Sequence, residues 1–163
     1  MKRAIRKVTF LLALVLVFAS MVVPAYAVEP RDNQDKPYKF EVVPTSGFAH
    51  TAGRVKETDS KLFTRVDTMK DKFVRVAAFS MDTSEGIPIN LTYYGSGLAP
   101  YVKCKRGINY GIGSVIYEYH QRLPYTYGNI GALGFQSALG YSDAISGLWS
   151  VDSTGSHSVP DAP

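Results

Sequence analysis

The stretches FVRVAAFSM, at residues 73–81, and IPINLTYY, at residues 87–94, decide the fold class of this chain. The first is a run of β-branched, aromatic and small apolar residues that is long enough for a central strand of a sheet. In the second, apolar side chains recur at every second position from Ile87 to Tyr93, which is the period of a half-buried strand. Pro88 favours a place at the start of a strand or at the edge of a sheet. Together the two stretches predict β-structure.

Three further stretches have the character of strands. Residues 38–42 (YKFEV) and 115–120 (VIYEYH) alternate between two kinds of side chain, and residues 148–151 (LWSV) contain the one tryptophan of the chain. Breaks that contain glycine or proline separate such runs at intervals of about 8–12 residues, a spacing typical of sandwiches and barrels. We therefore expect an all-β fold, with a single antiparallel β-sandwich domain over residues 37–151.

Residues 60–73 allow two interpretations. The apolar residues Leu62, Val66, Met69 and Phe73 recur at the spacing of a helical stripe. The same segment contains Thr64, Val66 and Thr68, which favour a strand. We expect a strand here, and a helix is the alternative.

The first 27 residues have the layout of a secretory signal peptide. A basic end is followed by an uncharged, mostly apolar run from Val8 to Val23, by Pro24 and by the small-x-small sequence Ala25-Tyr26-Ala27. We expect cleavage before Val28, so that no membrane span remains; an uncleaved anchor is the alternative. Residues 28–36 are predicted to be a flexible lead-in, and residues 152–163, which are small, polar and rich in proline, a disordered tail.

Removal of the signal peptide changes the charge of the protein. The whole chain has 18 Lys and Arg against 14 Asp and Glu, and four of the basic residues lie in residues 1–27. The remainder therefore has 14 of each (18 − 4 = 14) and no net charge. This balance argues against a nucleic-acid partner. Because the chain has one cysteine, it forms no internal disulfide.

Cys104 is the one candidate for a reactive thiol. It lies in the sequence Lys103-Cys104-Lys105-Arg106, whose three cations would lower the pKa of a neighbouring thiol. If the segment is a strand, however, Lys103 and Lys105 point to the opposite face from Cys104, and the cysteine is then an ordinary strand residue. Both interpretations remain open from the sequence.

The aromatic residues are the candidates for a binding surface. Tyr94, Tyr101 and Trp149 could contribute to a platform on which sugar rings stack, or they could belong to the core. The three histidines are scattered and form no metal-ligand spacing, and no catalytic or phosphate-binding motif is present. We therefore predict no catalytic residues, no metal and no cofactor.

Three short segments carry a resemblance to a known group of proteins. They are Tyr38-Lys39-Phe40-Glu41-Val42, Ala52-Gly53-Arg54-Val55-Lys56-Glu57-Thr58, and Ser146-Gly147-Leu148-Trp149-Ser150 with Asp152 just after it. These segments resemble those of small exported all-β proteins from Gram-positive bacteria that have no established function. The resemblance implies an all-β domain behind a signal peptide and implies no catalytic residues. Cys104 and residues 133–139 have no counterpart in that group.

The sequence thus predicts a secreted, non-enzymatic protein that binds an unknown ligand or is associated with the cell envelope. Cell-wall glycan or another envelope component is the expected partner. The alternative is a bacteriocin-like secreted antimicrobial protein, a class that the small, glycine- and tyrosine-rich body would suit. The neutral charge of residues 28–163 gives such a protein no attraction to anionic bilayers.

Overall fold

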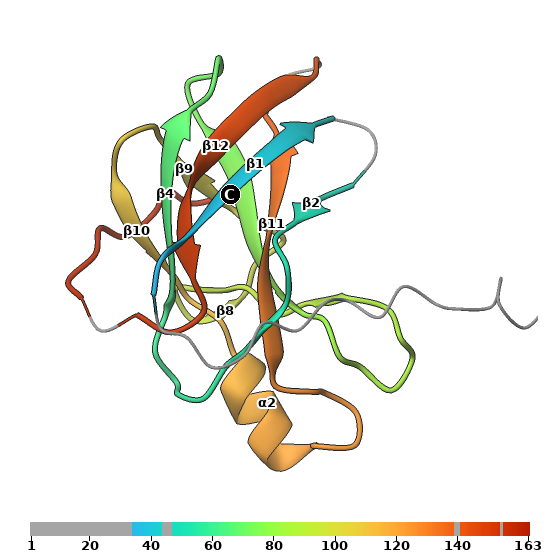
Figure 1. The fold of residues 1–163 in the computed structure, drawn as a ribbon. Helices are drawn as coiled ribbons and strands as arrows, with labels where there is room; N and C mark the ends of the chain where they lie inside the picture. Colours follow the sequence, from blue (N-terminus) through green and yellow to red (C-terminus); the bar gives the residue numbers. More distant parts are fainter. Residues whose placement is uncertain (1–33, 44–46, 139–140, 154) are drawn as a thin grey trace, which may run out of the picture.

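A computed structural model describes residues 34–43, 47–138, 141–153 and 155–163. The predicted signal peptide and most of the predicted lead-in lie outside these residues. The described chain is predominantly β, and all pairs of neighbouring strands in its sheets are antiparallel (Figure 1). The predicted all-β, antiparallel character is therefore confirmed. Within the described ranges, no helix has the length and apolar character needed to cross a membrane.

The first sheet has four strands in the order β1-β12-β4-β10. The bounds of these strands are Lys36–Val42 for β1, Asp143–Ser150 for β12, Leu62–Thr68 for β4 and Asn109–Ile112 for β10. Strand β1 lies at the edge of this sheet and pairs with β12 along its whole length. The strands predicted at 38–42 and within 60–73 are confirmed, and 148–151 lies largely within β12.

The second sheet has six strands built around β11 and β5. Its main order is β2-β11-β5-β6, with β3 also paired to β11 and β9 also paired to β5. The bounds are Ala49–His50 (β2), Arg54–Val55 (β3), Val74–Ser80 (β5), Ile89–Asn90 (β6), Val102–Cys104 (β9) and Ile130–Ser137 (β11). A hairpin of β7 (Tyr93–Tyr94) and β8 (Gly97–Leu98) and one short helix, α2 (Ile116–Arg122), complete the described elements.

Side chains from both sheets form one apolar core. Tyr38 of β1 contacts Phe135 of β11, with ring centroids 4.5 Å apart, and Val66 and Trp149 belong to the same buried cluster. Burial raises the pKa of the Tyr38 hydroxyl well above its ordinary value. Burial of apolar surface from two sheets against each other is the main force that holds them together.

The opposite face of β5 is buried as well. Ala77, Phe79 and Met81 form a second, smaller cluster, against which Phe48 and Tyr101 pack. Because β5 is covered on both faces, its sequence is a continuous apolar run rather than an alternating one. This is why the stretch at 73–81 predicts a central strand correctly.

The strand predicted at residues 115–120 is wrong, because this segment begins the helix α2. Ile116 is the one buried residue of the helix, while Glu118 lies in its first turn and His120 and Arg122 lie in its last turn. These charges suit the two ends of the helix dipole. A single buried side chain at the start of a short helix leaves no helical stripe for sequence analysis to detect.

The stretch at 87–94 forms two short strands, β6 and β7, rather than one. Between them the side-chain oxygen of Asn90 accepts hydrogen bonds from the backbone N–H and the hydroxyl of Thr92, at 3.0 and 2.6 Å. Asn side chains that bond locally in this way compete with the ladder of a sheet. The alternating pattern at 87–94 thus corresponds to β-structure, but the strand is interrupted between Asn90 and Tyr93.

The segment after residue 152 differs from the predicted disordered tail. Ser158 forms a parallel bridge with Tyr110 of β10, and Asp161 exchanges two backbone hydrogen bonds with Lys103 of β9, at 3.0 and 3.1 Å. The described C-terminal residues therefore pair with one strand from each sheet. Val159 is 65 % exposed, so this pairing uses backbone groups and leaves little hydrophobic signal in the sequence.

Gly147 allows β12 and β4 to approach each other where their register shifts, between Ser146 and Gly147. A Cβ at this position would collide with the carbonyl oxygen of Arg65 and would lie 2.7 Å from Tyr38 Oη. We expect Gly147→Ala to lower the free energy of unfolding by about 1–3 kcal/mol or more, because rigid backbone has to move. Gly97→Ala is the matched control, since no atom lies within 4 Å of a Cβ there. Equal stability of the two variants in urea denaturation would contradict this account.

Candidate functional site

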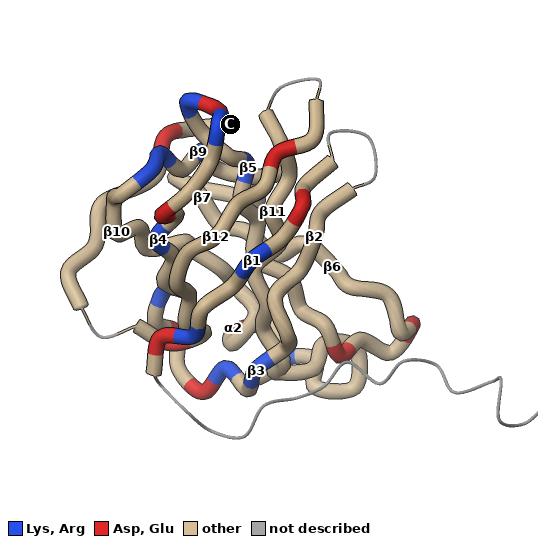
Figure 2. Tube along the Cα trace, turned by 45° about the horizontal axis from the view of Figure 1, so that its top comes forward, with Lys and Arg blue, Asp and Glu red and all other residues tan. Residues whose placement is uncertain are grey.

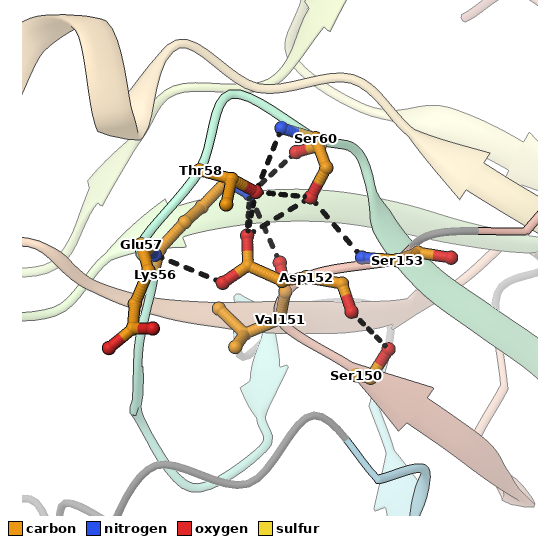
Figure 3. Close-up of polar contacts among 8 residues, drawn as sticks. All are labelled: Lys56, Glu57, Thr58, Ser60, Ser150, Val151, Asp152 and Ser153. Atoms are coloured by element: carbon orange, nitrogen blue, oxygen red, sulfur yellow. Dashed lines mark hydrogen bonds and ion pairs between the residues drawn. The ribbon is translucent and has the colours of Figure 1, made fainter.

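A buried ion pair joins the two sheets at the end of β12. Lys56 follows β3 of the second sheet, and Asp152 follows β12 of the first sheet. The ammonium Nζ of Lys56 lies 2.9 Å from Asp152 Oδ1, and the two side chains are 0 % and 6 % exposed (Figure 3). A charge this deeply buried is stable only when it is paired and hydrogen-bonded, so the partners constrain each other.

Both members of the ion pair form further hydrogen bonds. Lys56 Nζ also donates to the carbonyl oxygens of Ser60 and Val151, at 2.5 and 3.1 Å. The Asp152 carboxylate accepts from Glu57 N, Thr58 Oγ1 and Ser60 Oγ, at 3.0, 2.7 and 3.0 Å (Figure 3). We call Lys56, Glu57, Thr58, Ser60 and Asp152 the Asp152 clamp.

The clamp stabilises the protonated form of a lysine that burial disfavours. Burial lowers the pKa of Lys56 below its ordinary value, and the hydrogen bond that Lys56 donates to Asp152 and the charge of that carboxylate act in the opposite direction. All three N–H groups of the ammonium have acceptors. The clamp is therefore a structural connection between loop 56–60 and β12 rather than a set of free reactive groups.

A polar pocket of about 330 Å³ adjoins the clamp. Ser153 is the link between the two, since its backbone N–H donates to Ser60 Oγ at 3.2 Å and its hydroxyl is hydrogen-bonded to His157 Nε2. The ring of His157 lies against Phe63, with centroids 5.1 Å apart. We call this the His157 pocket; it is lined by Asp35, Phe63, Asn109, Ser150, Asp152, Ser153, Gly155 and His157.

The His157 pocket contains a contact between a serine and a histidine, together with other polar groups. A serine hydroxyl bonded to a histidine nitrogen is the contact of a nucleophile with its base. Here His157 Nδ1 has no partner among the described residues, and the nearby Asp152 carboxylate is engaged by the clamp. A catalytic triad requires a third group that orients the histidine. The pocket presents carboxylate, amide, hydroxyl and imidazole groups beside an aromatic ring.

The predicted aromatic platform is not assembled. Trp149 is 3 % exposed and belongs to the core between the sheets, so it cannot serve as an exposed stacking surface in this fold. Tyr94 is half-buried against the same core. Tyr101 packs instead on the second cluster, at the other face of β5, under the guanidinium of Arg75 at 4.9 Å. Tyr101 therefore lies apart from Trp149 and Tyr94, and the three residues form no common exposed surface.

Cys104 lies in the core, and its side chain is fully buried on β9. Burial raises the pKa of its thiol well above the ordinary value, whereas the sequence interpretation of a reactive thiol required a lowered pKa. Lys103 and Lys105 flank it along the strand, and strand alternation directs them away from the core. The structure thus argues against a reactive thiol and favours the interpretation of an ordinary strand residue.

Sequence analysis missed the clamp and the His157 pocket. Lys56 and Asp152 are 96 residues apart, and neither belongs to a local catalytic or metal motif. The one signal was the resemblance, because two of its three segments contain Lys56 and Asp152. His157 and Ser153 are four residues apart in a segment whose composition predicts disorder.

Comparison with known proteins adds no relative: no protein-family model, curated protein or solved structure matches this chain. Among the described residues, no three His, Cys, Asp or Glu side chains gather as a metal site would require.

Burial of Cys104 can be tested by thiol labelling, because the chain has one cysteine. We expect a thiol-specific chromogenic reagent to label the native protein orders of magnitude more slowly than the protein unfolded in urea. The reason is that labelling has to wait for opening of the core. Rapid labelling under native conditions, with circular dichroism showing an intact fold, would contradict the burial of this thiol.

The clamp can be tested through stability. We expect Asp152→Asn to lower the free energy of unfolding by about 3–5 kcal/mol, because it leaves the Lys56 ammonium buried without its counter-charge. Asp67→Asn is the control: it removes an ion pair with Arg65 whose partners are 41 % and 37 % exposed. We expect no measurable change for the control in urea denaturation. A loss no larger for Asp152→Asn than for Asp67→Asn would mean that the clamp does not hold the sheets together.

Proposed function

We propose that this chain is an exported, non-enzymatic binding protein of the cell envelope, with a β-sandwich formed by its two sheets. Its ligand is a glycan of the envelope, bound in the His157 pocket. The pocket itself is the observation that carries this proposal. The secretory layout of residues 1–27 supports the exported location.

The lining of the His157 pocket suits a sugar. Asp35 and Asn109 are exposed at the pocket, and Ser153 and His157 are half-buried in it. Carboxylate, amide, hydroxyl and imidazole groups together accept and donate hydrogen bonds, as the neighbouring hydroxyls of a sugar ring require. The aromatic ring of Phe63 adds an apolar surface beside them. A volume of about 330 Å³ is at the lower end of the usual range for small-molecule sites, which fits one or two sugar rings.

The clamp supports a binding role for the pocket by keeping one wall in place. Ser60 Oγ donates to Asp152 Oδ1 and accepts from Ser153 N, so the wall next to the pocket is attached to a buried ion pair. A wall that is ordered before the ligand arrives reduces the entropy that binding costs. This arrangement favours recognition by a preformed site.

Co-sedimentation with insoluble peptidoglycan tests the proposal. We expect the purified protein to sediment with cell-wall particles, and we expect Asn109→Ala to weaken binding about tenfold, as the loss of one well-placed polar contact does. Tyr125→Ala is the matched control, because Tyr125 is 95 % exposed and does not line the pocket.

Three results would contradict the proposal. Equal binding of Asn109→Ala, Tyr125→Ala and the parent protein would place the ligand elsewhere. Release of soluble sugar fragments by the protein would show an enzyme, and an absence of sedimentation combined with growth inhibition of sensitive bacteria would favour the antimicrobial class.

A further inference from the structure

Two cations occupy directly opposite positions on the outer face of the second sheet, the face turned away from the core between the sheets. Arg75 of β5 pairs with Lys103 of β9 in the antiparallel register, and both side chains are half-buried. The residues before and after each of them belong to that core, so strand alternation directs the two cations outward. The basic positions of β5 and β9 are blue in Figure 2.

An aromatic ring lies against each of these cations. Arg75 Cζ is 4.9 Å from the centroid of the Tyr101 ring, and Arg75 Nη1 donates to Gln136 Oε1 at 3.2 Å. Lys103 Nζ is 5.5 Å from the centroid of the Phe73 ring. A ring attracts a cation through its quadrupole and carries no net charge, so it positions the cation without neutralising it.

Neither cation has an ion-pair partner among the described residues. Asp161 is the acidic residue whose backbone pairs with Lys103, but its carboxylate lies 2.8 Å from Lys105 Nζ. Like charges at directly opposite positions of neighbouring strands repel each other and lower the stability of a sheet. The outer face therefore keeps an uncompensated positive charge that an anion from solution can offset.

The same face accounts for the basic residues that flank Cys104 in the sequence. Cys104 is buried in the core, whereas Lys103 and Lys105 alternate with it and project away from the core. The ion pair of Lys105 with Asp161 is exposed, with both side chains 54 % exposed, and such pairs are weak. Lys105 therefore extends the positive charge of this face beyond Lys103.

A phosphate group fits the spacing and the chemistry of Arg75 and Lys103. The Cβ atoms of directly opposite residues in an antiparallel pair are about 4.5–5.5 Å apart, so one anionic group can contact both side chains. A guanidinium presents a planar fork to two oxygens of a phosphate, and an ammonium adds a point charge. A phosphate presents more acceptor oxygens than a carboxylate does, which suits contact with both cations together.

We propose that Arg75 and Lys103 form a binding site for the phosphate groups of an anionic polymer, with Lys105 as a secondary contact. The polymer lies along β9 on the outer face of the second sheet, and one phosphate offsets the repulsion between the two cations. This surface is separate from the His157 pocket. The source of the polymer in the cell envelope rests on the proposed function, whereas the binding of phosphate groups does not.

Inorganic polyphosphate of defined length is the probe for this surface, with binding measured by isothermal titration calorimetry on the purified protein. We expect saturable binding at low ionic strength that weakens as added salt screens the charges. We expect inorganic monophosphate to bind more weakly, because a single group cannot engage Lys105 together with the pair.

Single substitutions place the effect on this face. We expect Lys103→Gln to weaken polyphosphate binding about tenfold, and without polyphosphate to leave the melting temperature unchanged or higher, because the repulsion of Arg75 is removed. Arg122→Gln, an equal loss of charge at the exposed end of α2, is the matched control and leaves binding unchanged. Arg75→Lys keeps the charge without the fork, and we expect weaker binding with an unchanged circular dichroism spectrum.

Four results would overturn the proposal. They are an absence of saturable polyphosphate binding, an equal effect of Lys103→Gln and Arg122→Gln, binding by Arg75→Lys as tight as that of the parent protein, and tighter binding of poly-L-glutamate at equal charge. The last result would assign the surface to carboxylates. None of these results bears on peptidoglycan binding through the His157 pocket, because that test changes Asn109 and uses a different ligand.

Discussion

The buried ion pair of Lys56 and Asp152 is the interaction on which the rest of this structure depends. It crosses from the end of β3 in the second sheet to the end of β12 in the first, where apolar packing alone would leave a loop and a strand end unconnected. Burial of a charge is costly, and the cost is recovered only if partner and hydrogen bonds are all in place. The pair therefore specifies one arrangement of loop 56–60 on β12 and excludes others.

The candidate site lies beside this crossing, because Asp152 lines the His157 pocket. A second pocket runs along β1 and is lined by Trp149, whose ring lies against Arg54. The two basic residues of the segment, Arg54 and Lys56, are both fully buried but differ in what they contact. Lys56 has three acceptors within the chain, whereas Arg54 Nε and Nη2 have no hydrogen-bond partner among the described residues.

The edge strand β1 and the strands β9 and β10 differ in what lies beside them. On the side of β10 and β9, the C-terminal segment pairs with both strands and connects the sheets through backbone hydrogen bonds. On the side of β1, a pocket separates the edge strand from residues 51–52. Lys39 and Glu41 are exposed on β1, and charges on an edge strand discourage pairing with other chains. Figure 2 shows basic and acidic positions on β1, which is the charge pattern that protects an edge strand.

The sequence by itself determined the β-class and the main strands, because a period of two at 38–42 and a continuous apolar run at 73–81 reflect burial of one face or of both. It could not determine the helix at Ile116–Arg122, whose single buried residue leaves no periodic pattern, nor the pairing of residues 158–161, which uses backbone atoms common to all residues. Tertiary structure alone decided that Trp149 and Cys104 are core residues and that Lys56 meets Asp152. The physical reason is that the sequence around a charged residue does not show whether its side chain is buried. Burial results from the packing of distant segments, which removes water from the charge and so requires a partner.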